Sequence, residues 1–194
     1  MPEPSPVRPT STPASARDDA SREPARANGS GPSEAESHAP AATETRKTLI
    51  VPVAGVEPSR VRDTFRASRG TRQHNALDIM APRGTPVLAA DDGRILRLSR
   101  NPAGGITIYQ HSADSQYVYY YAHLQGYRKG LAVGDVVRKG DVIAYVGTTG
   151  NAPDNLPHLH FQVMRYRPGR YWDGEPVNAH GWLVRQSPFL IINK

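Results

Sequence analysis

The chain has 194 residues, a formal net charge of +6 at pH 7 and no cysteine. The lack of cysteine excludes disulfide bonds and thiolate metal sites, so any bound metal ion would need His, Asp or Glu ligands. No apolar run approaches the ~20 residues of a membrane span, and the first residues lack the charged start and apolar centre of a signal peptide.

Residues 1–48 differ in composition from the rest of the chain. They hold 8 of the 18 prolines, no aromatic residue and, among Val, Ile and Leu, only Val7. Such a stretch buries too little apolar surface to offset the entropy lost on ordering, so we predict a disordered tail or linker. Its six basic and seven acidic residues leave +7 on residues 49–194, the predicted folded domain. This charge favours an anionic partner: nucleic acid, an anionic membrane or a cell-wall polymer.

From residue 48 onward, short β signals alternate with turn residues. The predicted strands cover residues 48–53, 86–90, 94–98, 106–110 and 117–124. Asp92-Gly93 is typical of a hairpin turn, and residues 134–147 predict a second hairpin with two Gly-Asp turns. Residues 148–156 form a polar loop, and residues 165–194 predict coil with a short strand or turn. No segment keeps a 3.6-residue period over 11 residues, so the domain is predicted to be nearly all β.

The pair His158 and His160 is the first candidate site. In a strand the two imidazoles share one face, while Leu159, Phe161 and Val163 point into a core. Either histidine can bind a metal ion or act as a general base, and the motif leaves these roles open.

His74 and Asp78 are the next candidates. In an extended strand their Cα atoms would lie about 13 Å apart, too far to share one metal ion. They are therefore expected where a loop turns into a strand, with the small Ala76 leaving room for the side chains to converge.

His123 ends an aromatic run. Strand alternation places it on one face with Tyr117, Tyr119 and Tyr121, which suggests the floor of a groove; ordinary cross-strand packing with a half-buried histidine is the alternative. Three candidate ligands and two spare histidines match catalytic zinc, which uses three protein ligands and an open position.

Residues 51–176 resemble the lysostaphin-type (LytM-like) zinc peptidases, which are peptidoglycan endopeptidases. The motifs that carry the resemblance occur in the family's order: Phe65 and Arg69, then His74-Asn75-Ala76-Leu77-Asp78-Ile79, residues 84–93, Tyr121-Ala122-His123-Leu124, residues 134–141, and Pro157-His158-Leu159-His160-Phe161. Three features depart from the family pattern: Ala76 replaces a common Gly, Gln162 replaces a common Glu, and residues 155–157 alter the loop before His158.

The resemblance implies that His74, Asp78 and His160 bind one zinc ion and that His123 and His158 are the catalytic histidines. It also implies a compact antiparallel β-sheet or flattened barrel-like sandwich with long loops around a metal groove. The expected activity is hydrolysis of peptide bonds in peptidoglycan cross-links or stem peptides, outside the cytoplasm, by a monomer that does not bind nucleic acid. His38, His111 and His180 match no motif position.

Two other functions compete with this one. A non-catalytic peptidoglycan-binding activator of another hydrolase typically lacks ligand histidines, whereas this chain keeps all five site positions. Residues 134–143 also resemble a biotinyl or lipoyl carrier hairpin, but such a carrier needs an exposed lysine at a hairpin tip, and Lys139 lies in the flanking turn.

Overall fold

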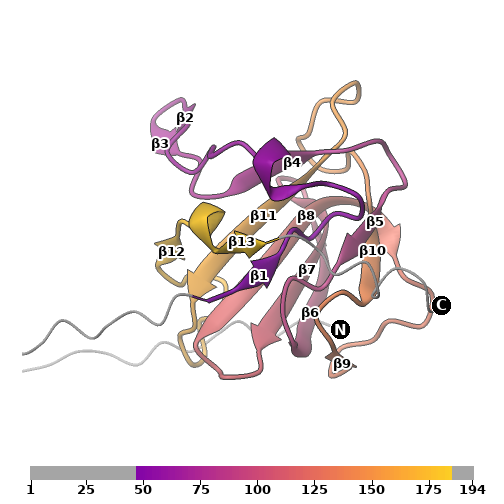
Figure 1. Ribbon diagram of the computed structural model, residues 1–194, viewed down its shortest axis with the longest axis vertical. Helices are drawn as coiled ribbons and strands as arrows, with labels where there is room; N and C mark the ends of the chain where they lie inside the picture. Colours follow the sequence, from indigo (N-terminus) through magenta and orange to yellow (C-terminus); the bar gives the residue numbers. More distant parts are fainter. Residues whose placement is uncertain (1–46, 185–194) are drawn as a thin grey trace, which may run out of the picture. The chain divides into compact units, whose positions relative to one another are not determined.

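The computed structural model describes residues 47–184 (Figure 1). The predicted tail, apart from Lys47 and Thr48, and the last ten residues lie outside this range, so a domain boundary at residue 49 stays a prediction. Within residues 47–184 the chain forms β-strands and two 3-10 turns, η1 (Pro58–Arg60) and η2 (His180–Trp182), with no α-helix. The prediction of a nearly all-β domain is therefore confirmed. No helix in this range has the length and apolar character that crossing a membrane requires.

The strands are short at the ends of the described chain and long in the middle. They are β1 (Leu49–Ile50), β2 (Ser68–Arg69), β3 (Arg72–Gln73), β4 (Leu77–Met80), β5 (Pro86–Leu88), β6 (Gly93–Asn101), β7 (Gly105–Ser112), β8 (Tyr117–Tyr127), β9 (Val136–Val137), β10 (Val142–Val146), β11 (His158–Arg165), β12 (Pro176–Val177) and β13 (Leu183–Val184).

One antiparallel sheet organises the domain. Its strands follow the order β12-β11-β8-β7-β6-β9, with β4 added beside β11, and β10 pairing both β8 and β5. The long strands β11, β8, β7 and β6 lie side by side in Figure 1. The path of pairing does not close into a barrel. The sheet places β11, which carries His158 and His160, between β4, which carries Asp78, and β8, which carries His123.

Two predicted hairpins are wrong. β5 pairs with β10, not β6, so Asp92-Gly93 does not connect neighbouring strands; and β9 pairs with β6, not β10, so residues 134–147 form no hairpin. The turn between β9 and β10 is itself bound to residue 89: the Gly140 amide donates to the Ala89 carbonyl, and the Ala89 amide donates to the Asp141 carbonyl. These long-range hydrogen bonds hold the turn against residue 89, and the two strands pair with different neighbours: β9 with β6, and β10 with β5 and β8.

The core lies behind the site-bearing face of the sheet. On β11, Leu159, Phe161 and Val163 are at most 2% exposed, as the alternation predicts. Tyr119 and Tyr121 of β8 are fully buried against Phe161. This packing fixes β8 and β11 relative to each other, and with them the residues on the opposite face.

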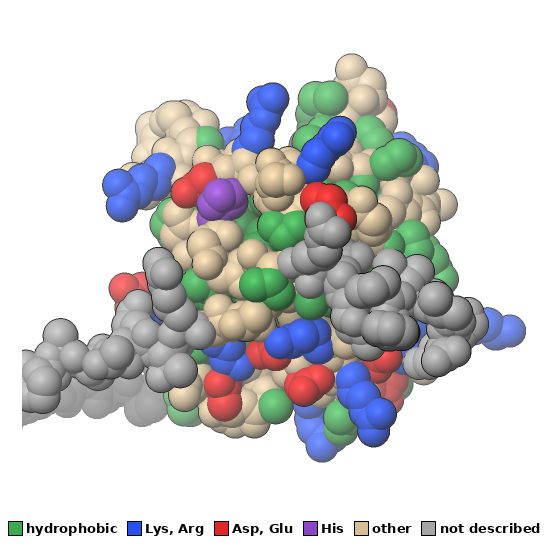
Figure 2. Space-filling model, viewed as in Figure 1, with side chains coloured by type: hydrophobic (Ala, Val, Ile, Leu, Met, Phe, Trp, Pro, Cys, Tyr) green, Lys and Arg blue, Asp and Glu red, His purple; other side chains and the backbone are tan. Residues whose placement is uncertain are grey.

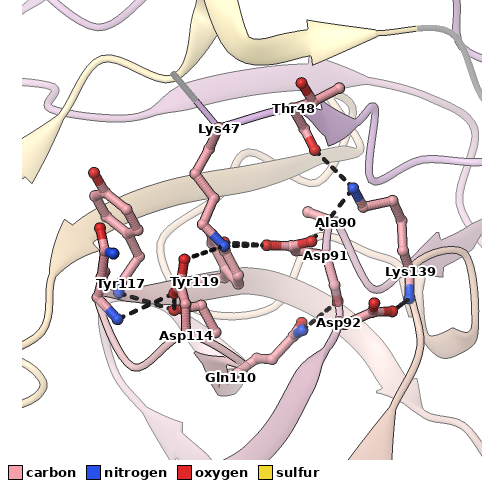
Figure 3. Close-up of polar contacts among 12 residues, drawn as sticks. Lys47, Thr48, Ala90, Asp91, Asp92, Gln110, Asp114, Tyr117, Tyr119 and Lys139 are labelled. Atoms are coloured by element: carbon pink, nitrogen blue, oxygen red, sulfur yellow. Dashed lines mark hydrogen bonds and ion pairs between the residues drawn. The ribbon is translucent and has the colours of Figure 1, made fainter. Parts of the chain in front are cut away.

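A buried charge cluster joins the start of the described chain to the sheet. Asp91, 8% exposed, accepts hydrogen bonds from Lys47 Nζ (2.6 Å) and Tyr119 Oη (2.8 Å), and Lys139 Nζ lies 3.3 Å from its other oxygen. Figure 3 shows the two lysines reaching Asp91 from opposite sides. Burial opposes ionisation of Asp91, but the hydrogen bonds from Lys47 and Tyr119 and the charges of the two lysines together outweigh it, and the pKa of Asp91 lies below its ordinary value. Lys139 also donates to the Thr48 carbonyl, so it is not a free lysine at a hairpin tip.

Candidate metal centre

The pairing of β4 with β11 brings two candidate ligands together. His160 stands directly opposite Asp78, and His158 stands opposite Met80. His74 precedes β4 in a turn in which Asn75 adopts a left-handed conformation (φ 58°). The expectation that His74 lies where a loop turns into a strand is therefore confirmed.

Thr64 supports both candidate ligands of the β4 region, His74 and Asp78. Its side-chain hydroxyl accepts from the Asp78 amide (3.0 Å) and donates to the Ala76 carbonyl (3.2 Å), while its carbonyl accepts from His74 Nδ1 (3.1 Å). Sequence reasoning missed this residue, because nothing in its local sequence shows that it faces His74 and Asp78.

Three candidate ligand atoms form a nearly equilateral triangle. His74 Nε2 lies 3.0 Å from Asp78 Oδ1 and 3.1 Å from His160 Nδ1, and the last two atoms lie 3.2 Å apart. A tetrahedral ion with bonds of ~2.0–2.1 Å needs its ligand atoms about 3.3 Å apart, so the spacing fits one zinc-sized ion. These three residues form the one group of three or more potential ligands found within the described range.

The protonation pattern also favours a cation. A carbonyl oxygen only accepts, so His74 Nδ1 carries the hydrogen and a neutral His74 turns a lone pair at Nε2 toward the centre. Burial opposes ionisation of Asp78, but the combined contacts of its carboxylate with His160 and His74 outweigh that effect and keep the pKa of Asp78 well below its ordinary range. Burial lowers the pKa of His160. An ionised carboxylate and neutral imidazoles are the forms that bind metal.

A β-bulge turns His123 toward this centre. Between Ile106 and Ile108 the β7–β8 register shifts, and His123 has a φ of 60°. Its amide donates to the Gly104 carbonyl (2.7 Å) instead of continuing the ladder.

The predicted grouping of His123 with three tyrosines is wrong because this bulge breaks the strand alternation. Tyr117, Tyr119 and Tyr121 are buried in the core, whereas Tyr120 shares the groove with His123.

His123 and His158 lie beside the ligand triangle and are held in the same way. His123 Nδ1 donates to the Thr149 carbonyl (2.8 Å) and His158 Nδ1 to the Leu156 carbonyl (2.7 Å). The ring centroids of the two histidines are 4.9 Å apart, and His158 Nε2 lies 3.8 Å from Asp78 Oδ1. Each neutral ring therefore keeps Nε2 free to accept a proton. Burial lowers the pKa of His123, which favours that neutral form.

All five predicted site residues line one groove of about 1010 Å³. The β2–β3 hairpin forms one wall, and residues 151–156 form another; both segments project at the same end of the domain in Figure 1. Arg69, one of the motif residues shared with the family, donates a hydrogen bond to Oδ2 of Asp78. Of the three histidines that match no motif position, two lie away from the groove: His111 packs against the Tyr166 ring, and His180 Nε2 donates to the Val61 carbonyl. His38 lies outside the described residues.

Residues 72–179 match the family model described as peptidase family M23, which covers more than half of the chain and all five site residues. The chain belongs to peptidase family M23. The M23 chain is 33% identical over 112 residues to the L-Ala--D-Glu endopeptidase of Bacillus subtilis (strain 168), covering 55% of the chain and 34% of that protein. It is 36% identical over 93 residues to the peptidoglycan DD-endopeptidase ShyC of Vibrio cholerae serotype O1, covering 48% of the chain and 20% of that protein. The chain thus spans about a third or less of these relatives.

Solved structures agree with the family assignment. Csd3 of Helicobacter pylori superposes with a TM-score of 0.56 at 28% identity, over 73% of this M23 chain and 36% of that protein. A zinc-containing peptidase from Vibrio cholerae gives a TM-score of 0.53 at 27% identity, over 70% of this chain and 40% of that protein. The family resemblance and the fold expected from it are therefore confirmed.

Proposed function

We propose that this M23 domain is a zinc-dependent endopeptidase that hydrolyses peptide bonds in the cross-links or stem peptides of peptidoglycan. The observation that carries the proposal is the triangle of His74, Asp78 and His160 with two further histidines beside it in one groove. The names of the relatives support the substrate class: one is a peptidoglycan DD-endopeptidase, and the other is an L-Ala--D-Glu endopeptidase.

In this proposal His74, Asp78 and His160 hold one zinc ion. A zinc ion bound there would supply Lewis acidity, lowering the pKa of a water toward ~7 and polarising the scissile carbonyl. The single carboxylate leaves the site with net positive charge, which favours an anionic nucleophile and a developing oxyanion.

His123 and His158 carry the proton chemistry. Each presents a free Nε2 toward the groove because its Nδ1 is bound to a backbone carbonyl. One neutral imidazole accepts the proton of the attacking water at Nε2. The other, when it carries a proton at Nε2, donates a hydrogen bond to the oxyanion or passes that proton to the leaving amine. Because both rings are held through Nδ1 by a backbone carbonyl, the proposal assigns neither role to a particular one of the two histidines.

The two competing functions have less support. A non-catalytic activator would not need five correctly placed side chains, and all five are present in this groove. A carrier domain would need a free lysine, whereas Lys139 is engaged by Asp91 and the Thr48 carbonyl.

The setting of the activity is part of the same proposal. We place the enzyme outside the cytoplasm, acting as a monomeric domain of residues 49–194 on wall peptides and not on nucleic acid. The charge of +7 on these residues suits an anionic wall polymer.

Digestion of purified peptidoglycan tests the proposal. Zinc-loaded protein is expected to release soluble muropeptides, a chelator to stop the release, and added zinc to restore it. Mass spectrometry of the products then identifies the bond. Release that survives complete removal of the metal would contradict the zinc mechanism, and no release by zinc-loaded protein would favour the activator.

A further inference from the structure

The groove has a second arm beyond the candidate metal centre. A hollow of about 910 Å³ runs from Ala54 to Thr85 and shares Asp78 and Met80 with the first arm. Met80 is 54% exposed at this junction although it is apolar. A peptide lying across Asp78 would therefore extend in both directions from the bond beside the metal centre.

Four arginines line the two arms, and we call them the cationic wall: Arg60 and Arg62 in the second arm, and Arg69 and Arg72 in the first. All four come from the segment just before β4, and Figure 2 shows cationic side chains projecting around β2, β3 and β4. Glu57 is the one acidic lining residue besides Asp78. The positive charge of the groove is therefore concentrated along one side.

On the opposite wall, the residues that line the groove are uncharged: Asn151, Ala152, Pro153 and Leu156 line the first arm between β10 and β11. Asp154 of the same loop lines neither arm. A ligand in this groove thus meets guanidinium groups on one side and small polar or apolar side chains on the other.

Three guanidinium groups of the cationic wall are available to a ligand. Arg69 is bound to Asp78, whereas Arg60, Arg62 and Arg72 are exposed and form no side-chain hydrogen bond or ion pair with another residue of the described range. An arginine offers a planar fork of N–H donors that matches a carboxylate better than any neutral peptide group.

We propose that the groove selects acidic peptides, and that Arg62 and Arg72 determine this selectivity by binding substrate carboxylates on either side of the scissile bond. This inference rests on the proposed function and narrows its substrate: peptides with free carboxylates are preferred over amidated or glycine-rich ones. The two arginines act on substrate binding and take no part in the proton chemistry.

Two matched peptides test the selectivity. They are fluorogenic cross-linked stem peptides with identical sequences, one with free side-chain and terminal carboxylates and one with those groups amidated. The test protein is Arg62→Gln/Arg72→Gln. The control is Arg97→Gln/Arg100→Gln, which removes the same charge from exposed positions on β6 that line neither arm.

The zinc-loaded wild type should cleave the acidic peptide with a kcat/KM about tenfold above that of the amidated one, because two exposed ion pairs together give roughly one order of magnitude. The test double variant should lose that advantage through KM, while the control keeps it. Equal cleavage of both peptides by the wild type, or an equal loss in the control, would overturn the inference and leave the proposed function standing.

Binding gives a readout that does not need catalysis. Fluorescence anisotropy of the two labelled peptides with metal-free protein should show the same preference and the same dependence on Arg62 and Arg72. If neither peptide is cleaved but the binding preference holds, the proposed function fails and the inferred selectivity for acidic peptides stands. If binding shows no preference, the selectivity inference is wrong.

Discussion

Replacing His123 with Asn separates catalysis from metal binding. His123 sits at φ 60°, where Asn is tolerated better than most residues, so the bulge should persist. The main structural loss is the hydrogen bond from Nδ1 to the Thr149 carbonyl, which costs about 1 kcal/mol of unfolding free energy. In a domain of this size that lowers Tm by roughly 2–4 °C, so the variant stays folded at 25 °C.

The same substitution removes one of the two free imidazole nitrogens beside the triangle. Loss of one general acid or base lowers kcat by about 10²- to 10⁴-fold, equivalent to about 2.7–5.4 kcal/mol of activation free energy. The three proposed ligands are untouched, so zinc content should equal that of the wild type.

The assay measures peptidoglycan release and zinc content on the same preparations. His111→Asn is the matched control, because His111 packs against the Tyr166 ring away from the groove. His123→Asn with activity within threefold of the wild type, or with its zinc lost, would refute the assignment of His123 as a catalytic residue beside the metal.

Three further predictions follow from the contacts described above. With His123 as the proton acceptor, kcat/KM should hold as the pH falls to 6.5 and decline only below it, because burial lowers the pKa of His123 and only the neutral ring accepts a proton; a decline centred above pH 7 would contradict that assignment. Asp91→Asn should cost about 1–3 kcal/mol of unfolding free energy, because Lys139 loses its carboxylate partner and Lys47 keeps only Asp114, yet kcat per folded molecule should not change; calorimetry showing an unchanged Tm would count against the buried cluster. Gly104→Ala should lower the unfolding free energy by about 1–3 kcal/mol, because the added Cβ would lie 2.1 Å from the Tyr120 hydroxyl. It should also lower kcat, because the Gly104 carbonyl accepts the hydrogen bond from the His123 amide and so helps to place His123. A variant with wild-type Tm and kcat would refute the packing described here.

Sequence periodicity predicts the features that depend on one strand. The alternation of His158, Leu159, His160 and Phe161 is visible in the sequence and holds in β11, because each side chain faces either the core or the groove. The turn at His74 was also predictable, since two ligands four residues apart cannot converge on an extended strand.

Features that depend on distant partners were not predictable. The separation of β9 from β10 results from bonds between their turn and Ala89, which lies about 50 residues earlier in the chain. The bulge that turns His123 toward the groove depends on the Gly104 carbonyl on the neighbouring hairpin, while the local sequence shows an uninterrupted aromatic strand. Thr64 likewise acquires its role only after the loop before β4 has folded back.

Anomalous diffraction at the zinc edge from zinc-loaded crystals tests the central claim most directly. We predict one strong peak within ~2.0–2.2 Å of His74 Nε2, Asp78 Oδ1 and His160 Nδ1, with His123 and His158 outside bonding distance. A peak bonded to His123 or His158 in place of one of these atoms, or no peak in the groove at all, would contradict the account.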